Sequence, residues 1–209
     1  MNDTITYAGF WRRFGAVWLD ILIMLPLVAL VWWGNGHVRL FHLYYFIPGH
    51  LVSLFYDVYL VRRFGGTPGK RMLGISIRKI DGSPIGYREA ILRYLPQAVL
   101  ATLATIGLIY ATLAFTDAAY AAMSISERRH QIAALAPAWY ATVNTLFAIW
   151  LFSEPIVMLT NRKRRALHDF IAGTIVLRDA PKPAANAIDH SQPTQRGRAS
   201  AARPPLRPR

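Results

Sequence analysis

The sequence predicts an all-α membrane protein with four transmembrane helices, a small cytoplasmic hairpin-like segment and a disordered basic tail. Three observations support this class: long apolar runs, basic residues gathered on alternate connections, and a C-terminus without apolar periodicity. The first run, residues 14–33, is about as long as a bilayer core is thick, at roughly 20 residues of ~1.5 Å each. It is too long for the apolar part of a signal peptide, so we expect it to be retained.

Three further apolar runs are long enough to span a bilayer. They cover residues 41–61, 94–116 and 137–159. Little sequence remains between them for a separate soluble domain, so we expect one membrane domain over residues 1–179. Residues 180–209 are rich in Pro, Ala, Arg and Gln, a composition typical of a disordered tail.

Basic residues predict the orientation of the four helices. Of the 24 Lys and Arg residues, 21 lie before the first run, between the second and third runs, or after the fourth. The two other connections carry only Arg39, Arg128 and Arg129. Because cytoplasmic connections are enriched in Lys and Arg, both termini are expected in the cytoplasm. The net charge of +13 then reflects topology and attraction to anionic lipid head groups rather than nucleic-acid binding.

The connection over residues 62–93 is expected to form structure on the membrane surface. Ile75 and Ile77 alternate with Ser76 and Arg78, and Asp81-Gly82 is a turn signal, so we predict a short strand followed by a turn. Residues 174–178 (TIVLR) are also β-prone and are a candidate partner for this strand.

Three carboxylates, Asp20, Asp57 and Glu154, lie within the apolar runs. A charged side chain at the centre of a bilayer costs about 2.5–3.5 kcal/mol on insertion scales, so each carboxylate needs a partner or a function. The predicted topology places all three in the cytoplasmic half, where they are candidates for binding a proton or a small cation. The alternative is structural pairing with arginines at the same boundary. These are Arg12, Arg13, Arg62 and Arg93.

His50 is a further candidate, as a proton carrier beside Asp57. His50, Ser53 and Asp57 are spaced i, i+3 and i+7, so they share one helical face. This face should point into the bundle or a wet cavity, because lipid offers polar groups no partner. Pro48-Gly49 would add a hinge or a cavity wall.

Other site chemistries are not supported. The chain has no cysteine, which excludes disulfides, thiolate metal ligands and Cys nucleophiles. Residues 65–70 (GGTPGK) lack the GxxxxGK[ST] spacing of a phosphate loop and are better explained as a tight turn with lipid-facing cations. The histidines have no metal-ligand spacing, and no nucleophile elbow is present. We therefore expect no metal, no cofactor, no nucleic-acid partner and no enzymatic activity.

Three motifs carry a resemblance to a known family. They read RRFGAVWLD at residues 12–20, GGTPGKRMLG at 65–74 and RALHDFIAGT at 165–174. In this order they resemble the RDD family of bacterial membrane proteins, which is named after one arginine and two aspartates. The resemblance covers about residues 7–178.

The resemblance assigns several residues by position. Arg13 and Asp20 match the first motif, Asp169 matches the third, and Asp57 lies where many members carry an acidic residue. The remaining motif and charge-pairing candidates are Arg12, Lys70, Arg165 and His168.

The resemblance implies a multi-pass protein of the bacterial inner (plasma) membrane. The family is mostly uncharacterised, and a few members have been linked to transport, including sodium/proton exchange. Our first hypothesis is transport of a small ion or solute through the intramembrane carboxylates, by a homo-oligomer because four spans are few. The alternative is a non-transporting scaffold whose cytoplasmic face binds anionic lipid or another membrane protein.

Overall fold

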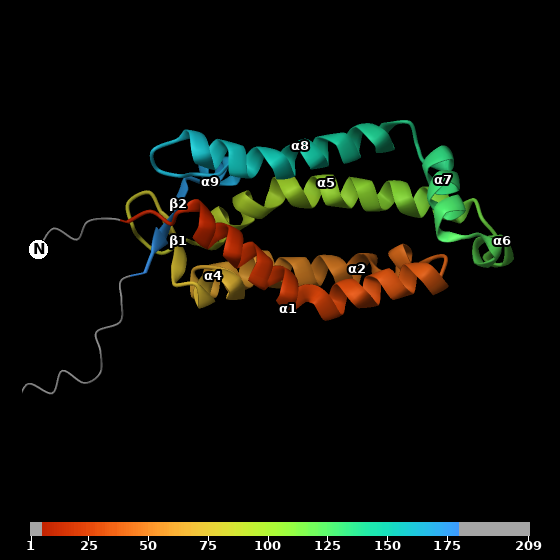
Figure 1. The fold of residues 1–209 in the computed structure, drawn as a ribbon, viewed down its shortest axis with the longest axis horizontal. Helices are drawn as coiled ribbons and strands as arrows, with labels where there is room; N and C mark the ends of the chain where they lie inside the picture. The colour runs from red at the N-terminus through yellow and green to blue at the C-terminus, as the bar shows by residue number, and fades with distance from the viewer. Residues whose placement is uncertain (1–5, 180–209) are drawn as a thin grey trace, which may run out of the picture. The chain divides into compact units, whose positions relative to one another are not determined.

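The computed structural model describes residues 6–179 of the 209-residue chain. By its internal contacts the chain divides into one unit over Met1–Asp179 and a second over Ala180–Arg209. The first unit is a bundle of long helices with a small two-stranded sheet at one end (Figure 1). The predicted disordered tail, residues 180–209, lies outside the described residues.

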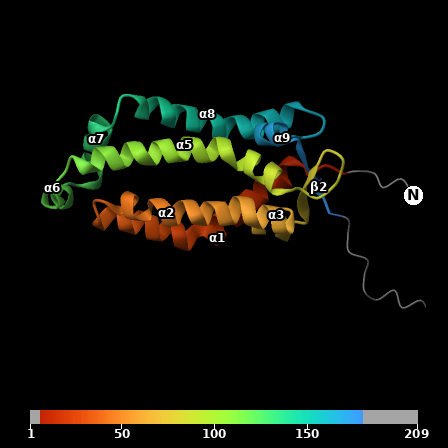
Figure 2. The same cartoon turned by 180° about the vertical axis from the view of Figure 1, so that it is seen from behind.

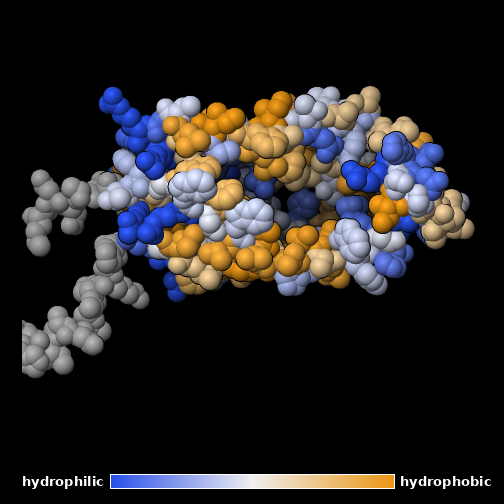
Figure 3. Space-filling model, in the orientation of Figure 1, coloured by the Kyte–Doolittle hydropathy of each residue, from blue (hydrophilic) through white to orange (hydrophobic). Residues whose placement is uncertain are grey.

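Within residues 6–179, three helices are long and apolar enough to cross a membrane. They are α1 (Phe10–His37), α5 (Tyr87–Leu113) and α8 (Trp139–Thr160). Many of their large apolar side chains point outward: Leu22 is 60% exposed, Trp32 72% and Phe152 70%. Apolar side chains also cover much of the surface along the middle of the bundle (Figure 3). This outward apolar surface suits lipid, because exposing it to water would cost about 25 cal/mol for each Å².

The second apolar run forms three consecutive helical segments, α2 (Phe41–Leu54), a π-helix η1 (Phe55–Tyr59) and α3 (Leu60–Phe64). They lie beside α1, while α5 and α8 form the other layer of the bundle (Figures 1 and 2). Short π-helical turns inside α-helices are frequent at functional sites. Asp57 is the central residue of this one.

The two strands are β1 (Ile75–Lys79) and β2 (Thr174–Arg178), which pair antiparallel with Ile77 opposite Val176. The pairing between these segments that the sequence suggested is therefore present. After the turn at Gly82 the chain returns to β1 only through a single bridge between Arg78 and Pro84. The partner of β1 is thus a distant strand rather than the second arm of a hairpin.

The sheet is the most completely buried part of the described chain. Ile75, Ile77, Ile175 and Val176 are each at most 2% exposed. The segment before α1 runs along the free edge of β2, where Ala8 N–H donates to the Val176 carbonyl at 3.0 Å. The sheet therefore holds together the segment before α1, the segment after α4 and the end of the described chain.

Two short helices complete this end of the bundle. They are α4 (Pro68–Met72), which packs on α1, and α9 (Leu167–Ala172), which packs on α5. We call this end of the bundle the motif end (residues 6–20, 62–93 and 161–179), because it holds all three sequence motifs.

The opposite end carries α6 (Asp117–Ala122) and α7 (Ile125–Leu135). Ser124 and Glu127 form a capping box that starts α7, with Ser124 N–H donating to Glu127 Oε2 at 2.8 Å. Arg128 donates to the carbonyls of Asn35 and Gly36, and so fastens α7 to the end of α1. The two ends of the bundle are thus closed by different sets of contacts.

Candidate functional site

Asp20 fastens α4 and η1 to α1. Its Oδ1 accepts hydrogen bonds from Tyr56 Oη at 2.6 Å and from Gly69 N–H at 2.7 Å. Its Oδ2 accepts from Thr67 Oγ1 at 2.6 Å. Three donors therefore satisfy this carboxylate, and the expectation that a neighbouring arginine pairs with it is wrong.

Glycine at position 69 allows this close approach. A Cβ added at Gly69 would lie 2.8 Å from Asp20 Cγ and would also collide with the carbonyl oxygen of Ala16. The glycine-rich motif therefore serves contact between α4 and α1, and it exposes one backbone N–H to the Asp20 carboxylate.

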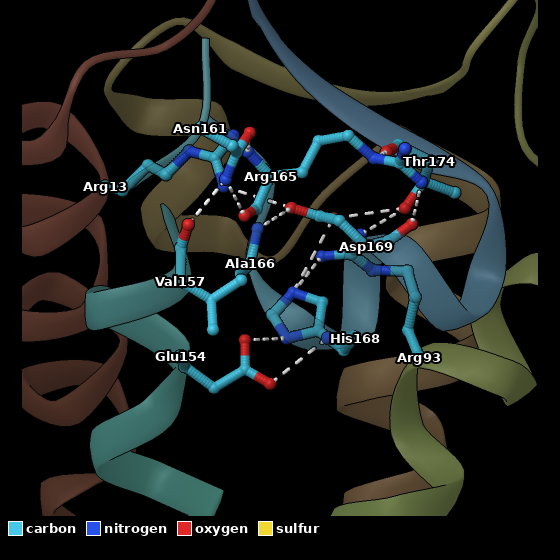
Figure 4. Close-up of polar contacts among 10 residues, drawn as sticks. All are labelled: Arg13, Arg93, Glu154, Val157, Asn161, Arg165, Ala166, His168, Asp169 and Thr174. Atoms are coloured by element: carbon cyan, nitrogen blue, oxygen red, sulfur yellow. Dashed lines mark hydrogen bonds and ion pairs between the residues drawn. The ribbon is translucent and has the colours of Figure 1, made fainter. Parts of the chain in front are cut away.

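Asp169 is the centre of a buried ion-pair network at the motif end (Figure 4). Its side chain is 0% exposed, and its Oδ2 lies 3.1 Å from Nη1 of Arg13. Arg93 contacts Oδ1 through its own Nη1. Thr174 Oγ1 donates to Oδ1 at 3.1 Å, and Ala166 N–H donates to Oδ2 at 3.0 Å. One carboxylate thereby joins α1, α5, α9 and β2.

The network holds Asp169 in its ionised form. Burial alone would raise the pKa of Asp169, but the nearby Arg93, His168 and Arg13 outweigh it and hold the pKa well below its ordinary value. Arg165 does not pair with the Asp169 carboxylate. It donates to the backbone carbonyls of Thr174 and Asp169 at 3.0 and 2.8 Å, and so holds the backbone around the network in place.

Glu154 is partnered by His168 rather than by an arginine. His168 Nε2 lies 2.7 Å from Nη2 of Arg93, which can only donate, so Nε2 is the acceptor and the ring proton is on Nδ1. Nδ1 lies 2.5 Å from Glu154 Oε2, and His168 N–H donates to Glu154 Oε1 at 3.2 Å. Burial, followed by Arg93, lowers the pKa of His168. The imidazole is therefore neutral near pH 7.

The arginines expected to neutralise Asp20, Asp57 and Glu154 make other contacts. Arg13 and Arg93 pair with Asp169. Arg12 donates to the Leu73 carbonyl at 3.0 Å, and Arg62 lies over the ring of Tyr87 at 5.7 Å. The three carboxylates also have separate environments, since hydroxyl and amide donors hold Asp20 and His168 holds Glu154.

Asp57 differs from the other two carboxylates because, among residues 6–179, it makes no hydrogen bond or ion pair. It lines a cavity of about 410 Å³ between α1, α2, η1 and α5. Figure 3 shows the surface hollowed between the two helix layers. His50 and Ser53 line the same cavity, as their shared helical face predicted, and His50 Nε2 lies 2.7 Å from Thr102 Oγ1.

A second, smaller cavity of about 110 Å³ lies on the motif side of Asp57. Asp57, Tyr94 and Gln97 line both cavities, so these three residues form the wall between them. Lys70 lines the smaller one together with the two fixed side chains Arg93 and His168. The expectation that Lys70 faces lipid is therefore wrong.

Several of these residues were missed from the sequence. Asp20 is completed by Tyr56 and Thr67, and Asp169 by Thr174. The two threonines lie inside sequence motifs, which was a weak signal, whereas nothing in the sequence pointed to Tyr56. Gln97 gave a usable signal, since an amide inside an apolar run needs a polar neighbour. Asn161, which bonds the Val157 and Arg165 backbone, gave none.

The apolar helices and the closed motif end define a helical integral membrane protein. The family model described as RDD family matches residues 7–173, and the chain belongs to the RDD family. The family predicted from the three motifs is thereby confirmed. The chain is also similar to the uncharacterized protein YckC of Bacillus subtilis (strain 168), with 28% identity over 182 residues, 83% of this chain and 86% of YckC. No solved structure matches the chain significantly.

Proposed function

We propose that this protein carries a small cation, a proton or sodium ion, across the inner (plasma) membrane, and that Asp57 is the carboxylate that binds it. The observation that carries the proposal is an unpartnered carboxylate, on a π-helical turn, in the wall of a cavity between apolar helices. Ionisable groups at such places are costly and mark ion pathways. The proposal contains no catalytic step.

The proposal requires four spans. The segments α2, η1 and α3 together have 24 residues, which is about 36 Å at 1.5 Å per residue and enough to cross a bilayer core. Their antiparallel course beside α1 supports this role. We propose that the motif end and both termini lie in the cytoplasm, and the basic residues of that end support this orientation.

The surroundings of Asp57 suit a hard cation. Ser53, Tyr94 and Gln97, which each carry a side-chain oxygen, line the same cavity as Asp57. His50 and its neighbour Thr102 would pass a proton along the same cavity. Four spans offer little enclosure for an aqueous path, so we propose that the protein works as a homo-oligomer.

A scaffold that binds anionic lipid head groups is a second proposal, favoured by a separate observation. Exposed cations cluster at the motif end beside the exposed apolar side chains of Trp11, Phe64 and Met72. They are Arg12, Arg62, Arg63, Arg71, Arg88, Arg162, Lys163, Arg164 and Arg178. Each such residue near an anionic surface contributes about 1 kcal/mol to binding.

Flux of protons and sodium in liposomes of purified protein distinguishes the two proposals. We expect exchange by the wild type and at least a tenfold loss in Asp57→Asn. Asp179→Asn is the matched control, because it makes the same chemical change in the partner of Arg71, away from both cavities. Equal flux in correctly inserted Asp57→Asn would overturn the transport proposal. No flux in the wild type, with strong binding to anionic vesicles, would favour the scaffold.

A further inference from the structure

Lys70 lines the smaller cavity and, unlike Arg93, it is not held there by a described partner. Among residues 6–179 it makes no ion pair and no hydrogen bond. Its backbone is held in place, because Thr67 and Gly69 just before it both bond to Asp20. A long, flexible side chain therefore extends from a fixed point into the smaller cavity.

The other cations around this cavity are held. Arg93 contacts Asp169, Thr174 and His168 at once. Arg13 is held by Asp169 on the far side of the same network. Lys70 is therefore the cation here that can change position without breaking a contact of the network.

Charged groups from every neighbouring element act on Lys70. Burial, followed by Arg93 on α5, lowers its pKa, while Asp20 on α1, Asp57 on η1 and Asp169 on α9 raise it. His168 is neutral, and Asp20 and Asp169 are already satisfied by other donors. Of the three carboxylates that act on Lys70, Asp57 is thus the one whose oxygens can still accept a hydrogen bond from an ammonium group.

We propose that Lys70 is a tethered cation that competes with the transported cation for Asp57. The inference rests on the proposed function of Asp57. In the empty protein the Lys70 ammonium balances the Asp57 carboxylate through the shared wall of the two cavities. A sodium ion entering from the larger cavity takes its place, and the displaced ammonium gives its proton to water in the smaller cavity. One sodium ion is bound for each proton released, so the charge of the site is unchanged.

This arrangement defines the class of substrate as a monovalent cation. An anion would gain nothing from Asp57, and a divalent cation would leave one uncompensated positive charge beside Asp57 and Arg93. It also assigns Lys70 the coupling between sodium and protons, a role that a fixed, always charged arginine could not fill.

Amine labelling of the purified wild-type protein tests the proposal directly. The chain has only four lysines, Lys70, Lys79, Lys163 and Lys182, so mass spectrometry can follow each one. An acid anhydride reacts with the neutral form of an amine. The anhydride should therefore label Lys70 several-fold faster in sodium chloride than in choline chloride of equal concentration. Exposed Lys163 is the internal reference, and its rate should not change. Asp57→Asn should raise Lys70 labelling in either salt, and Asp179→Asn should not.

The outcomes separate this inference from the proposed function. If neither sodium nor Asp57→Asn changes the rate of Lys70 labelling, the tethered-cation role is overturned, even if the wild type shows flux. Labelling that responds to Asp57→Asn but not to sodium would overturn the competition and leave a static pair. Flux gives a second measurement: Lys70→Arg should reduce sodium-driven proton release at least tenfold, and wild-type rates in that variant would contradict the proposal.

Discussion

At the scale of single residues, Asp169 has the largest structural role. It is a fully buried carboxylate between two guanidinium groups, and among the described residues the Nε and Nη2 atoms of Arg13 are buried without another partner. A buried ion pair contributes little compared with an apolar replacement, but removal of one partner leaves an uncompensated charge. The network is therefore fragile to single substitutions.

We expect Asp169→Asn to lower the stability of the protein by about 3–5 kcal/mol, since it leaves Arg13 and Arg93 without their shared anion. The thermal midpoint of the detergent-solubilised protein measures the effect. Asp179→Asn breaks a partly exposed pair with Arg71 and should cost at most about 1 kcal/mol. Equal midpoints for the two variants would show that the buried network does not support the fold.

His168 makes stability depend on pH. Its pKa is lowered in the folded protein, first by burial and then by Arg93, so the unfolded chain binds more protons below pH ~6.5. The stability it contributes is complete above that pH and falls as the pH is lowered. We expect the wild-type melting temperature to drop between pH 7.5 and 5.5 and the slope to be shallower in His168→Gln. Substitution of exposed His130 by Gln should leave the slope unchanged, and an unchanged slope in both variants would contradict this role.

The sequence indicated which residues carry charge but not how they pair. Asp169 and Arg13 were found through their motifs, and Asp20 and Asp57 through their places in apolar runs. The partners were misassigned because residues such as Arg13 and Asp169 are 156 positions apart, and their contact depends on how α1 and α9 pack. Lys70 was assigned to lipid for the same reason.

At the scale of elements, the contact between α4 and α1 sets the position of Lys70, which lines the smaller cavity. It depends on a glycine at position 69, whose N–H reaches Asp20 only because no side chain intervenes. The GTPG sequence is therefore a packing motif, and it also fixes the point from which Lys70 extends.

We expect Gly69→Ala to destabilise the protein by about 1–3 kcal/mol, because the added methyl group would overlap the Ala16 carbonyl and the Asp20 carboxylate. Gly36→Ala is the matched control: it lies in α1, and its Cβ would meet nothing within 4 Å. Thermal melting and digestion by protease at the motif end would compare the two. A Gly69→Ala protein as stable as Gly36→Ala would show that the close approach is not required.

Element boundaries were predicted unevenly. The first apolar run, with Phe14 to Trp33, corresponds to α1 because strong hydropathy and length suffice to predict a helix there. The π-helical turn around Asp57 could not be predicted, since a one-residue widening of the helix leaves no periodic signal. The partner of β1 could be suggested only by composition, because nearly 100 residues separate Lys79 from Thr174.

At the scale of the whole molecule, the distribution of charge and the fold support the same orientation. Of the described basic residues, Arg39, Arg128 and Arg129 lie at the α6–α7 end, and the others lie toward the motif end (Figure 1). The motif end also carries exposed cations beside the sheet, α4 and α9, and these side chains need water or lipid head groups around them. A cytoplasmic motif end satisfies both the charge rule and the chemistry of that surface.

Cysteine accessibility in intact cells tests this topology, and the chain has no native cysteine to interfere. Val38 and Ile80 flank the segment formed by α2, η1 and α3, so they lie on opposite sides of the membrane only if that segment crosses it. We expect a membrane-impermeant maleimide to label Val38→Cys and Ser126→Cys from outside, because both lie toward the α6–α7 end. Ile80→Cys and Lys163→Cys should be labelled only after permeabilisation. Labelling of Val38 and Ile80 from the same side would leave three spans, and it would remove the transmembrane path on which a carrier role for Asp57 depends.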